Sequence, residues 1–378
     1  MVEIYHIPAM LKETIEGLAI KPQGVYVDVT FGGGGHSRAI LEKMGNPNEL
    51  SNLNNQNKLS NLNNPNELSN LNNQNKLSSL NNQNKLSNLN NQNKLSSLNN
   101  QNKLSNPGRL FSFDQDSDAL QNIKANGRVD EWTDEKWTFV HSNFRYLRNW
   151  MDYYGVEGID GLLADLGVSF HHFDCPERGF SFRFSAPLDM RMNQTAKRTA
   201  ADIVNGYSEE ELAQLFWLYG ELKNGRGIAR NICKARTQKA IERTEDLVAI
   251  MAKDARLMAN GEIEVPTNAK KDLARLFQAL RIEVNDEMGA LREMLVAARD
   301  LLKPGGRLAV LTYHSLEDRL VKNFMRSGNL EGTIEKDFYG NNLSPFTLIE
   351  KGREASAEEV ERNPRARSAK LRIAEKRG

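Results

Sequence analysis

The chain has 378 residues, of which 26% are charged and 39% hydrophobic, and its formal net charge is +1. This length suffices for one large domain or a domain with a subdomain, and the balanced charge excludes nucleic-acid binding through a global basic excess, so any such contact needs a local patch. Cys175 and Cys233 stand far apart without metal-ligand spacing, and no apolar run approaches the roughly 20 residues of a membrane span, so we expect a cytoplasmic protein with no disulfide framework, no structural zinc and no membrane anchor.

The first predicted elements are a strand over 25–29, four glycines at 32–35 and a helix that begins near Ser37. A glycine loop between a strand and a helix lets a ligand approach bare backbone, because no side chain blocks it and positive φ is allowed. The glycines do not follow the G-x-G-x-x-G spacing, and an acid, Asp28, precedes them. This pattern favours the first loop of an S-adenosylmethionine methyltransferase over a pyrophosphate cradle, and an ordinary glycine-rich turn is the alternative.

A nine-residue repeat follows, with six copies and part of a seventh from Asn48 onward, most of them close to NKLSNLNNQ. Nine residues turn a helix by about 900°, so the Leu-x-x-Leu pair of each copy lies opposite that of the next and no continuous apolar stripe forms. Asn and Ser also compete with helical backbone hydrogen bonds. We interpret 46–106 as a low-complexity, disordered insertion whose removal leaves the fold intact, with a short β-solenoid as the alternative.

The insertion explains the position of the next acid. A nucleoside-binding fold places an acid about 20 residues past its glycines, at the end of the second strand, where it binds a ribose. The candidate is Asp114, which lies 79 residues past Gly35, or 18 once the 61 residues from Asn46 to Asn106 are set aside. The repeat is therefore interpreted as an expansion of the loop between the first helix and the second strand, where added length costs little closure entropy.

Further strand patterns occur at 110–114, 137–141, 158–164, 307–312 and 369–374. Strands that alternate with helices predict a parallel, doubly wound α/β sheet of the Rossmann-like kind, in which ligands bind at the carboxyl ends of the strands. Asp28, Asp114, Phe144 and Asp165 all fall at such ends. Four suitable strand ends support a nucleoside site more strongly than one glycine loop does.

The middle of the chain changes character, because no strand pattern occurs between about 184 and 265. Helices are predicted at 208–219, 227–236 and 244–258, the first opened by a capping pair, Ser208 and Glu211. A single long helix is predicted over 270–302. We therefore expect an all-helical subdomain inserted in an α/β domain. The expected divisions are 1–45, 107–183 and 270–378 for the α/β domain, 46–106 for the repeat insertion and 184–269 for the helical subdomain.

Nine motifs, in order along the chain outside the repeat, carry a resemblance to a known family. They are TFGGGGHS (30–37), FDQD (113–116), DLGVS (165–169), ERGFSFRF (177–184), PLDMRMN (187–193), FQALRIEVNDE (277–287), KPGGRL (303–308), YHSLEDR (313–319) and NPRARSAKLRIAEK (363–376). On these motifs the chain resembles the small-subunit ribosomal RNA cytosine-N4 methyltransferases, the RsmH or MraW family. The resemblance implies a Rossmann-like fold with an inserted helical domain, and it implies methylation of the N4 amine of a cytosine in the decoding region of 16S ribosomal RNA. It also implies S-adenosylmethionine as the cofactor and the small ribosomal subunit as the partner.

The resemblance also assigns the cofactor site. Its positions correspond to Gly34, Gly35, His36, Asp114, Phe144, Asp165 and His172. An acid on vicinal hydroxyls and backbone amides around a carboxylate suit this zwitterionic cofactor. Taken alone, His172 would be a solvent-exposed loop residue. Because the transferred methyl group is already activated, we expect no metal.

Asp165 is the expected acceptor for one N–H of the cytosine amine, together with the backbone carbonyls of Leu166 and Gly167. The amine is conjugated into the ring, so an acceptor must orient it toward the methyl group. Other amino-methyltransferases carry Asn/Asp-Pro-Pro-Tyr at this position, and that tetrapeptide is absent here. His314 is a second catalytic candidate, as a proton shuttle or phosphate ligand, with capping of the strand end as its alternative.

Substrate contacts are expected from aromatic and basic residues. Phe180, Phe182 and Tyr313 are candidates to stack on a base that leaves its helix, with plain core packing as the alternative. Basic residues of two motif regions, Arg191 among them, are expected to contact phosphates, with a solvated face as the alternative for the C-terminal group. The full set is Arg178, Arg183, Arg191, Arg365, Arg367, Lys370, Arg372, Lys376 and Arg377.

Three other functions compete. A DNA or protein amino-methyltransferase is disfavoured by the absent Asn/Asp-Pro-Pro-Tyr, and a non-catalytic cofactor- or ribosome-binding protein by the intact glycine and DLGVS loops. A NAD-dependent enzyme is the alternative from fold alone, and the missing G-x-G-x-x-G weakens it. The sequence leaves open whether the protein forms a homodimer.

Overall fold

The computed structural model describes residues 8–45, 108–119, 136–168 and 175–378, and its centre is a seven-stranded sheet. The strands are β1 (Val25–Asp28), β2 (Arg109–Asp114), β3 (Trp137–His141), β4 (Ile159–Asp165), β7 (Leu302–Thr312), β8 (Phe346–Glu354) and β9 (Lys370–Lys376). The expected α/β fold is therefore confirmed. The repeat region 46–106 and His172 lie outside the described residues, so the predictions made for them stay predictions.

The sheet is doubly wound, with the strand order β3-β2-β1-β4-β7-β9-β8. Strands β3, β2, β1, β4 and β7 run parallel, while β9 and β8 are antiparallel additions at one edge. The carboxyl ends of β1, β2, β3, β4 and β7 therefore meet at one edge of the sheet, where this fold class binds its ligands.

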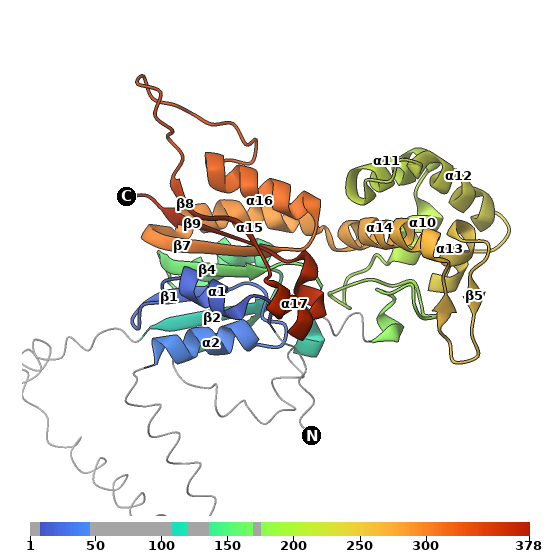
Figure 1. Cartoon of the computed structure of the whole chain (residues 1–378), viewed down its shortest axis with the longest axis horizontal. Helices are drawn as coiled ribbons and strands as arrows, with labels where there is room; N and C mark the ends of the chain where they lie inside the picture. The colour runs from blue at the N-terminus through green and yellow to red at the C-terminus, as the bar shows by residue number, and fades with distance from the viewer. Residues whose placement is uncertain (1–7, 46–107, 120–135, 169–174) are drawn as a thin grey trace, which may run out of the picture.

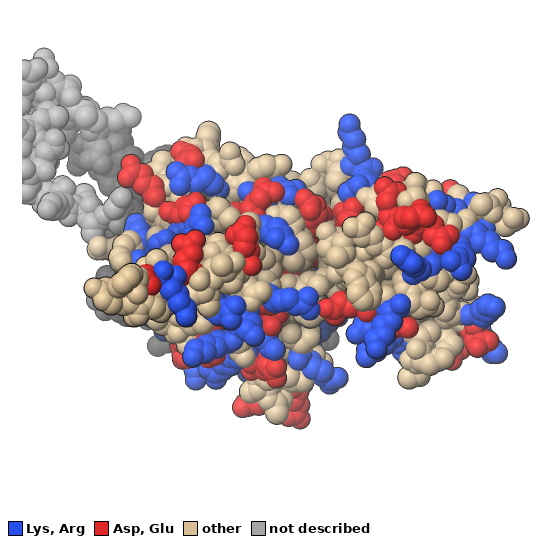
Figure 2. Space-filling model, turned by 90° about the horizontal axis from the view of Figure 1, so that it is seen from above, with Lys and Arg blue, Asp and Glu red and all other residues tan. Residues whose placement is uncertain are grey.

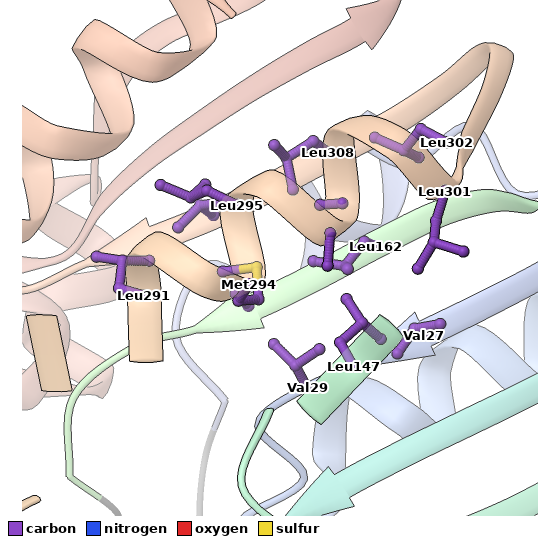
Figure 3. Packing of buried hydrophobic residues seen from close by; sticks show 14 of the residues in the cluster. Val27, Val29, Leu147, Leu162, Leu291, Met294, Leu295, Leu301, Leu302 and Leu308 are labelled. Atoms are coloured by element: carbon purple, nitrogen blue, oxygen red, sulfur yellow. The ribbon is translucent and has the colours of Figure 1, made fainter. Parts of the chain in front are cut away.

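One face of the sheet is covered by helices that bury a large apolar cluster. These helices are α8 (Leu147–Tyr153), α15 (Glu287–Leu301) and α16 (Ser315–Ser327). Figure 3 shows Leu291, Met294 and Leu295 along α15, which lies over β4 and Leu162, with Val27 of β1 nearby. Burying each such side chain stabilises the fold by about 1.5–3 kcal/mol relative to leaving it exposed.

The opposite face carries a smaller apolar cluster beneath α1 (Leu11–Gly17) and α2 (Gly35–Met44). Ile40 of α2 is fully buried there, as are Leu110 of β2 and Leu371 of β9. Near the carboxyl edge this face also receives α17 (Ala357–Arg362) and the 3-10 turn η4 (Pro364–Ser368), which precede β9.

A second body, with its own apolar cluster, lies to the right of the sheet in Figure 1. Its helices are α10 (Ala200–Gly206), α11 (Glu209–Gly220), α12 (Gly225–Arg236), α13 (Thr244–Met251) and α14 (Thr267–Asn285). The capping box predicted for α11 is present, with Ser208 and Glu211 bonding each other's backbone N–H groups. The expectation of an all-helical segment is wrong, because β5 (Arg256–Leu257) and β6 (Ile263–Glu264) form a short antiparallel pair at 256–264, where the sequence had predicted the end of a helix.

The predicted single helix over 270–302 is also wrong, because the chain breaks at Asp286. This residue adopts a left-handed conformation, with φ 46° and ψ 47°, and separates α14 from α15. The Arg145 guanidinium pairs with Asp286 at 2.6 Å and with Glu293 of α15 at 2.8 Å, which holds the break against the sheet body. The break lets α14 pack in the second cluster and α15 in the first.

The charged residues are distributed over both bodies. In the view of Figure 2, Lys and Arg side chains alternate with Asp and Glu side chains across the face that is seen, as the net charge of +1 suggests. Among the described residues, no helix is long and apolar enough to cross a membrane.

Candidate active site

The carboxyl ends of the strands open into a cavity of about 660 Å³, a volume within the range of small-molecule sites. One wall comes from the loops after β1, β2, β3, β4 and β7, and the facing wall comes from 180–183 and from α14. Gly35, His36, Asp114, Phe144 and Asp165, all predicted to hold the cofactor, line this cavity together.

The glycine loop is shaped by contacts that exclude side chains. Gly34 caps α2 with φ 75°, and a Cβ there would lie 2.7 Å from the Phe31 ring. A Cβ on Gly35 would lie 2.8 Å from Pro8. The loop therefore presents bare backbone and the N-terminus of α2 to the cavity, an arrangement that suits a carboxylate or phosphate group. Gly34 itself is not part of the cavity lining, and its contribution is to shape the turn before α2.

Asp114 is held in place at the cavity wall by two backbone groups. Its Oδ2 accepts a hydrogen bond of 2.9 Å from the Gly32 N–H, and its Oδ1 accepts one of 2.9 Å from the Asp116 N–H. Each carboxylate oxygen can accept a further bond, so the side chain is oriented yet still able to bind a hydroxyl. The side chain lies beside Gln115 in the lining, with Asn143 and Phe144 from the next strand end.

Asp165 is the most perturbed carboxyl group of the site. Its side chain is 11% exposed, and burial raises its pKa to about 7, although the Tyr313 hydroxyl donates to its Oδ1 at 2.7 Å and opposes the shift. The charge of Glu317 raises the pKa further. Its backbone N–H donates to the Thr30 hydroxyl at 2.7 Å, which ties the end of β4 to the end of β1. A carboxyl group with this pKa changes charge near neutral pH, as a proton acceptor requires.

The loop after Asp165 lies close to Tyr313. Gly167 has φ 102°, and a Cβ on it would lie 3.3 Å from the Tyr313 ring. A side chain at this position would therefore be strained and would crowd the wall of the cavity. Tyr313 lines the cavity and anchors Asp165 through its hydroxyl, while its expected stacking role stays a prediction.

His314 occupies the N-cap position of α16. Its Nδ1 accepts from the Glu317 N–H at 3.4 Å, while Glu317 Oε2 accepts from the Tyr313 N–H at 2.9 Å. Burial alone would raise the pKa of Glu317, but His314 and the Tyr313 N–H hold it below its ordinary value. The capping alternative for His314 is thus realised, and the side chain also lines the cavity, so its chemical role stays a prediction.

Sequence reasoning missed Arg281 of α14, which lines the cavity from the second body. Its guanidinium binds Glu287 through two bonds of 2.8 and 3.0 Å. Burial alone would lower the pKa of Arg281, but Glu287 and Glu317 keep it above its ordinary value. Glu287, His314 and Glu317 also bring three metal-ligand-type atoms within 4.8 Å of one another, and Arg281 supplies positive charge to this group. Arg281 lies in the FQALRIEVNDE motif, but no local pattern in the sequence indicated that its side chain would reach the cavity.

The predicted aromatic residues divide between cavity and core. Phe180 is 4% exposed and belongs to the second apolar cluster, as its packing alternative stated, while one side still reaches the cavity lining. Phe182 packs edge-on against Phe277, with ring centroids 5.6 Å apart, and both rings line the cavity.

The basic residues divide in the same way. Arg191 binds Asp189 and the Ala196 carbonyl and is absent from the cavity lining. Its predicted contact with the substrate is therefore untested, and its position does not support it. Arg178 is buried in ion pairs with Asp116 and Asp118. The arginines that line the cavity are Arg183, Arg281, Arg365 and Arg367.

Comparison with known proteins agrees with this geometry. A family model described as the MraW methylase family matches residues 3–102 and 98–377. A ribosomal RNA small subunit methyltransferase H from Phocaeicola vulgatus is 48% identical over 376 residues, covering 99% of this chain and 98% of its own. Proteins of the same name from Parabacteroides distasonis and Bacteroides thetaiotaomicron are 49% and 47% identical, each over 374 residues; the alignments cover 98% and 99% of this chain and 97% and 98% of the relatives. The resemblance predicted from the nine motifs is confirmed, and the chain belongs to the MraW methylase family.

Proposed function

We propose that this protein transfers a methyl group from S-adenosylmethionine to the N4 amine of a cytosine in the 16S ribosomal RNA of the small subunit, in the decoding region and in the cytoplasm. The observation that carries the proposal is Asp165, a buried carboxyl group in the cavity lining whose pKa is raised to about 7. An acceptor of this kind suits an amine that must lose a proton when it is methylated.

The glycine side of the cavity suits the cofactor. Backbone N–H groups at the start of α2 face the place for its carboxylate, and Asp114 faces the place for its ribose hydroxyls. Phe144 offers an apolar surface at the next strand end for an adenine ring. When bound, S-adenosylmethionine would supply an electrophilic methyl group for the amine nitrogen, with sulfur as the leaving group.

The protein orients the amine and receives its proton. Asp165 accepts one N–H of the amine, and the Leu166 and Gly167 carbonyls lie in the same loop for the other. These hydrogen bonds hold the amine protons away from the ring plane, so that the nitrogen lone pair can attack the methyl group. The Tyr313 hydroxyl holds Asp165 in position while this occurs, because it donates to the oxygen of Asp165 at 2.7 Å.

The second body supplies the nucleic-acid side. A base that leaves its helix can stack on an aromatic face, and Phe182 of the facing wall offers one. Arg183 from the second body and Arg365 and Arg367 from η4 line the same cavity from opposite sides. Arginines so placed suit the phosphates that flank an extruded nucleotide, and they provide a local patch without a global basic excess.

The experiment that tests this function is transfer of tritium from methyl-labelled S-adenosylmethionine to isolated small subunits, to free ribosomal RNA and to DNA. The reacted RNA is digested to nucleosides and analysed by mass spectrometry. We expect label in the small-subunit RNA and a single new nucleoside, N4-methylcytidine. Label in a protein, in DNA or on a different nucleoside would overturn the proposal.

A further inference from the structure

His36 lies in a position that contact with a cofactor alone does not explain. The side chain is 4% exposed, and it lies within electrostatic reach of two carboxyl groups, Asp28 of β1 and Asp165 of β4. Its Nε2 lies 3.2 Å from the Ala9 carbonyl, and its Nδ1 lies 3.6 Å from Asp165 Oδ2. A carbonyl can only accept, so the proton of the neutral ring belongs on Nε2 and the lone pair of Nδ1 faces Asp165.

This arrangement leaves room for one further proton between the two residues. An ionised Asp165 and the lone pair of Nδ1 repel each other, whereas a proton on either atom turns the contact into an attraction. Asp28 favours the charge that such a proton brings to His36, because its carboxyl group is fully buried and acts on the ring electrostatically. Ser37 fixes Asp28 through a bond of 2.6 Å to its Oδ2.

We propose that His36 is a positioning residue for Asp165, whose Nδ1 takes over the proton that Asp165 receives from the cytosine amine. This inference rests on the proposed function, since it concerns the proton which that reaction releases. The proton leaves the amine nitrogen for a carboxylate oxygen of Asp165 and then passes from Oδ2 to Nδ1. Asp165 returns to its ionised form and His36 becomes a cation, so no charge is created or lost.

The charged groups around the pair act on both of its members. Burial lowers the pKa of His36 below its ordinary value, and Asp28 opposes that shift without reversing it. Tyr313 donates to the other oxygen of Asp165 and stabilises its ionised form, while Glu317 lies on the Tyr313 side and does the opposite. The pair therefore titrates as a unit, in which a change to one member shifts the other.

The first test follows the imidazole nitrogens of His36 by ¹⁵N NMR in the full chain without ligands. The chain has six histidines, and the spectrum of His36→Gln identifies the signal that belongs to His36. We expect the Nδ1 signal to shift with pH in wild type, and we expect Asp165→Asn to remove or displace that step by more than one pH unit. An identical His36 titration in wild type and Asp165→Asn would overturn the proposal.

The second test separates positioning from cofactor binding. His36→Gln keeps a donor for the Ala9 carbonyl, whereas His36→Asn keeps a polar group near the Nδ1 position; neither can carry the extra proton. We expect both to lower kcat by about 10-fold or more and to move the acid limb of the pH profile, while the KM for S-adenosylmethionine changes less than 3-fold. A raised KM with an unchanged pH limb would assign His36 to the cofactor instead. If wild type methylates no small subunits, the proposed function fails, whereas the NMR result stands apart from it.

Discussion

Strand β4 has an aspartate near each end, and the two differ in almost every respect. Asp160, near the amino end, pairs with Lys303 at 3.0 Å and Lys21 at 3.5 Å and accepts the Val25 N–H. Burial alone would raise the pKa of Asp160, but these partners hold it below its ordinary value. Asp165, at the carboxyl end, faces a tyrosine hydroxyl and a histidine, and burial raises its pKa to about 7.

The difference shows how one sheet separates stability from chemistry. At the amino edge a carboxylate is neutralised by cations and contributes to folding. At the carboxyl edge the Asp165 carboxyl group is buried, and no lysine or arginine pairs with it in the described part of the chain. This burial costs stability and prepares the group to accept a proton. The predictions below test that contrast, from the largest expected effect to the smallest.

Removing the acceptor should have the largest effect. We expect Asp165→Ala and Asp165→Asn to lower kcat for methyl transfer by about 10²–10⁴-fold, because each removes a positioned proton acceptor. Asp160→Asn is the matched control, since it removes the same charge from the other end of β4, and it should retain most activity. Turnover of folded Asp165→Asn near the wild-type rate would show that another group accepts the proton.

Removing the ribose acid should weaken the cofactor. A charge-assisted bond to a hydroxyl contributes about 1.5–3 kcal/mol, so Asp114→Ala should raise the dissociation constant for S-adenosylmethionine by roughly 10–150-fold. Isothermal calorimetry measures this constant directly, and Asp118→Ala tests whether loss of a neighbouring acid gives the same result. Unchanged affinity in Asp114→Ala would remove its assignment to the ribose.

The two ends of β4 should respond oppositely when stability is measured. A raised pKa costs stability above the folded pKa and costs none below the unfolded pKa, so Asp165→Asn should gain about 1–4 kcal/mol at pH 8 and little at pH 4. Asn can still accept from Tyr313 and can donate to His36. A lowered pKa acts in the opposite sense, so Asp160→Asn should lose up to about 1 kcal/mol at pH 8 and most of that at pH 4, because this contribution fades only as the pH falls below the unfolded pKa of about 3.9. Urea unfolding at both pH values gives the four free energies, and the same sign for both variants at pH 8 would contradict the contrast.

Replacing an arginine of the cavity lining should have the smallest effect of the four changes. Arg183→Gln and Arg367→Gln should each weaken binding of the small subunit and reduce the slope of log affinity against log salt by roughly one unit or less. Affinity for S-adenosylmethionine should not change. Arg191→Gln is the control, because Asp189 holds that side chain outside the cavity lining. If Arg191→Gln has the larger salt effect, the RNA path runs over a different face.

Much of the sheet and of its site could be predicted because the signals are local. Asp28, Asp114 and Asp165 directly follow apolar runs, and strands of one direction bring their carboxyl ends together. Strand β8 escaped prediction because it is an edge strand in which half-buried and exposed residues alternate and the second half is mostly charged. The break at Asp286 escaped because apolar residues keep helical spacing on both sides of it.

What the sequence could not supply was the packing of one body against the other. Arg281 and Phe277 reach the cavity only because α14 of the second body forms its facing wall. Arg183 and Arg191 come from neighbouring motifs, yet one lines the cavity and the other pairs with Asp189. Such differences depend on contacts between residues far apart in the chain, for which a local pattern holds no signal.

The pH dependence of kcat/KM for methyl transfer tests the central claim most directly, because it reports the ionisation of essential groups in the free enzyme. The contrast between Asp160 and Asp165 predicts that kcat/KM rises about tenfold per pH unit below a midpoint near 7 and is level above it. A profile that stays level from pH 5.5 to 8.5 would contradict the account, because Asp165 would then be ionised throughout and would not be the group that titrates at the carboxyl edge.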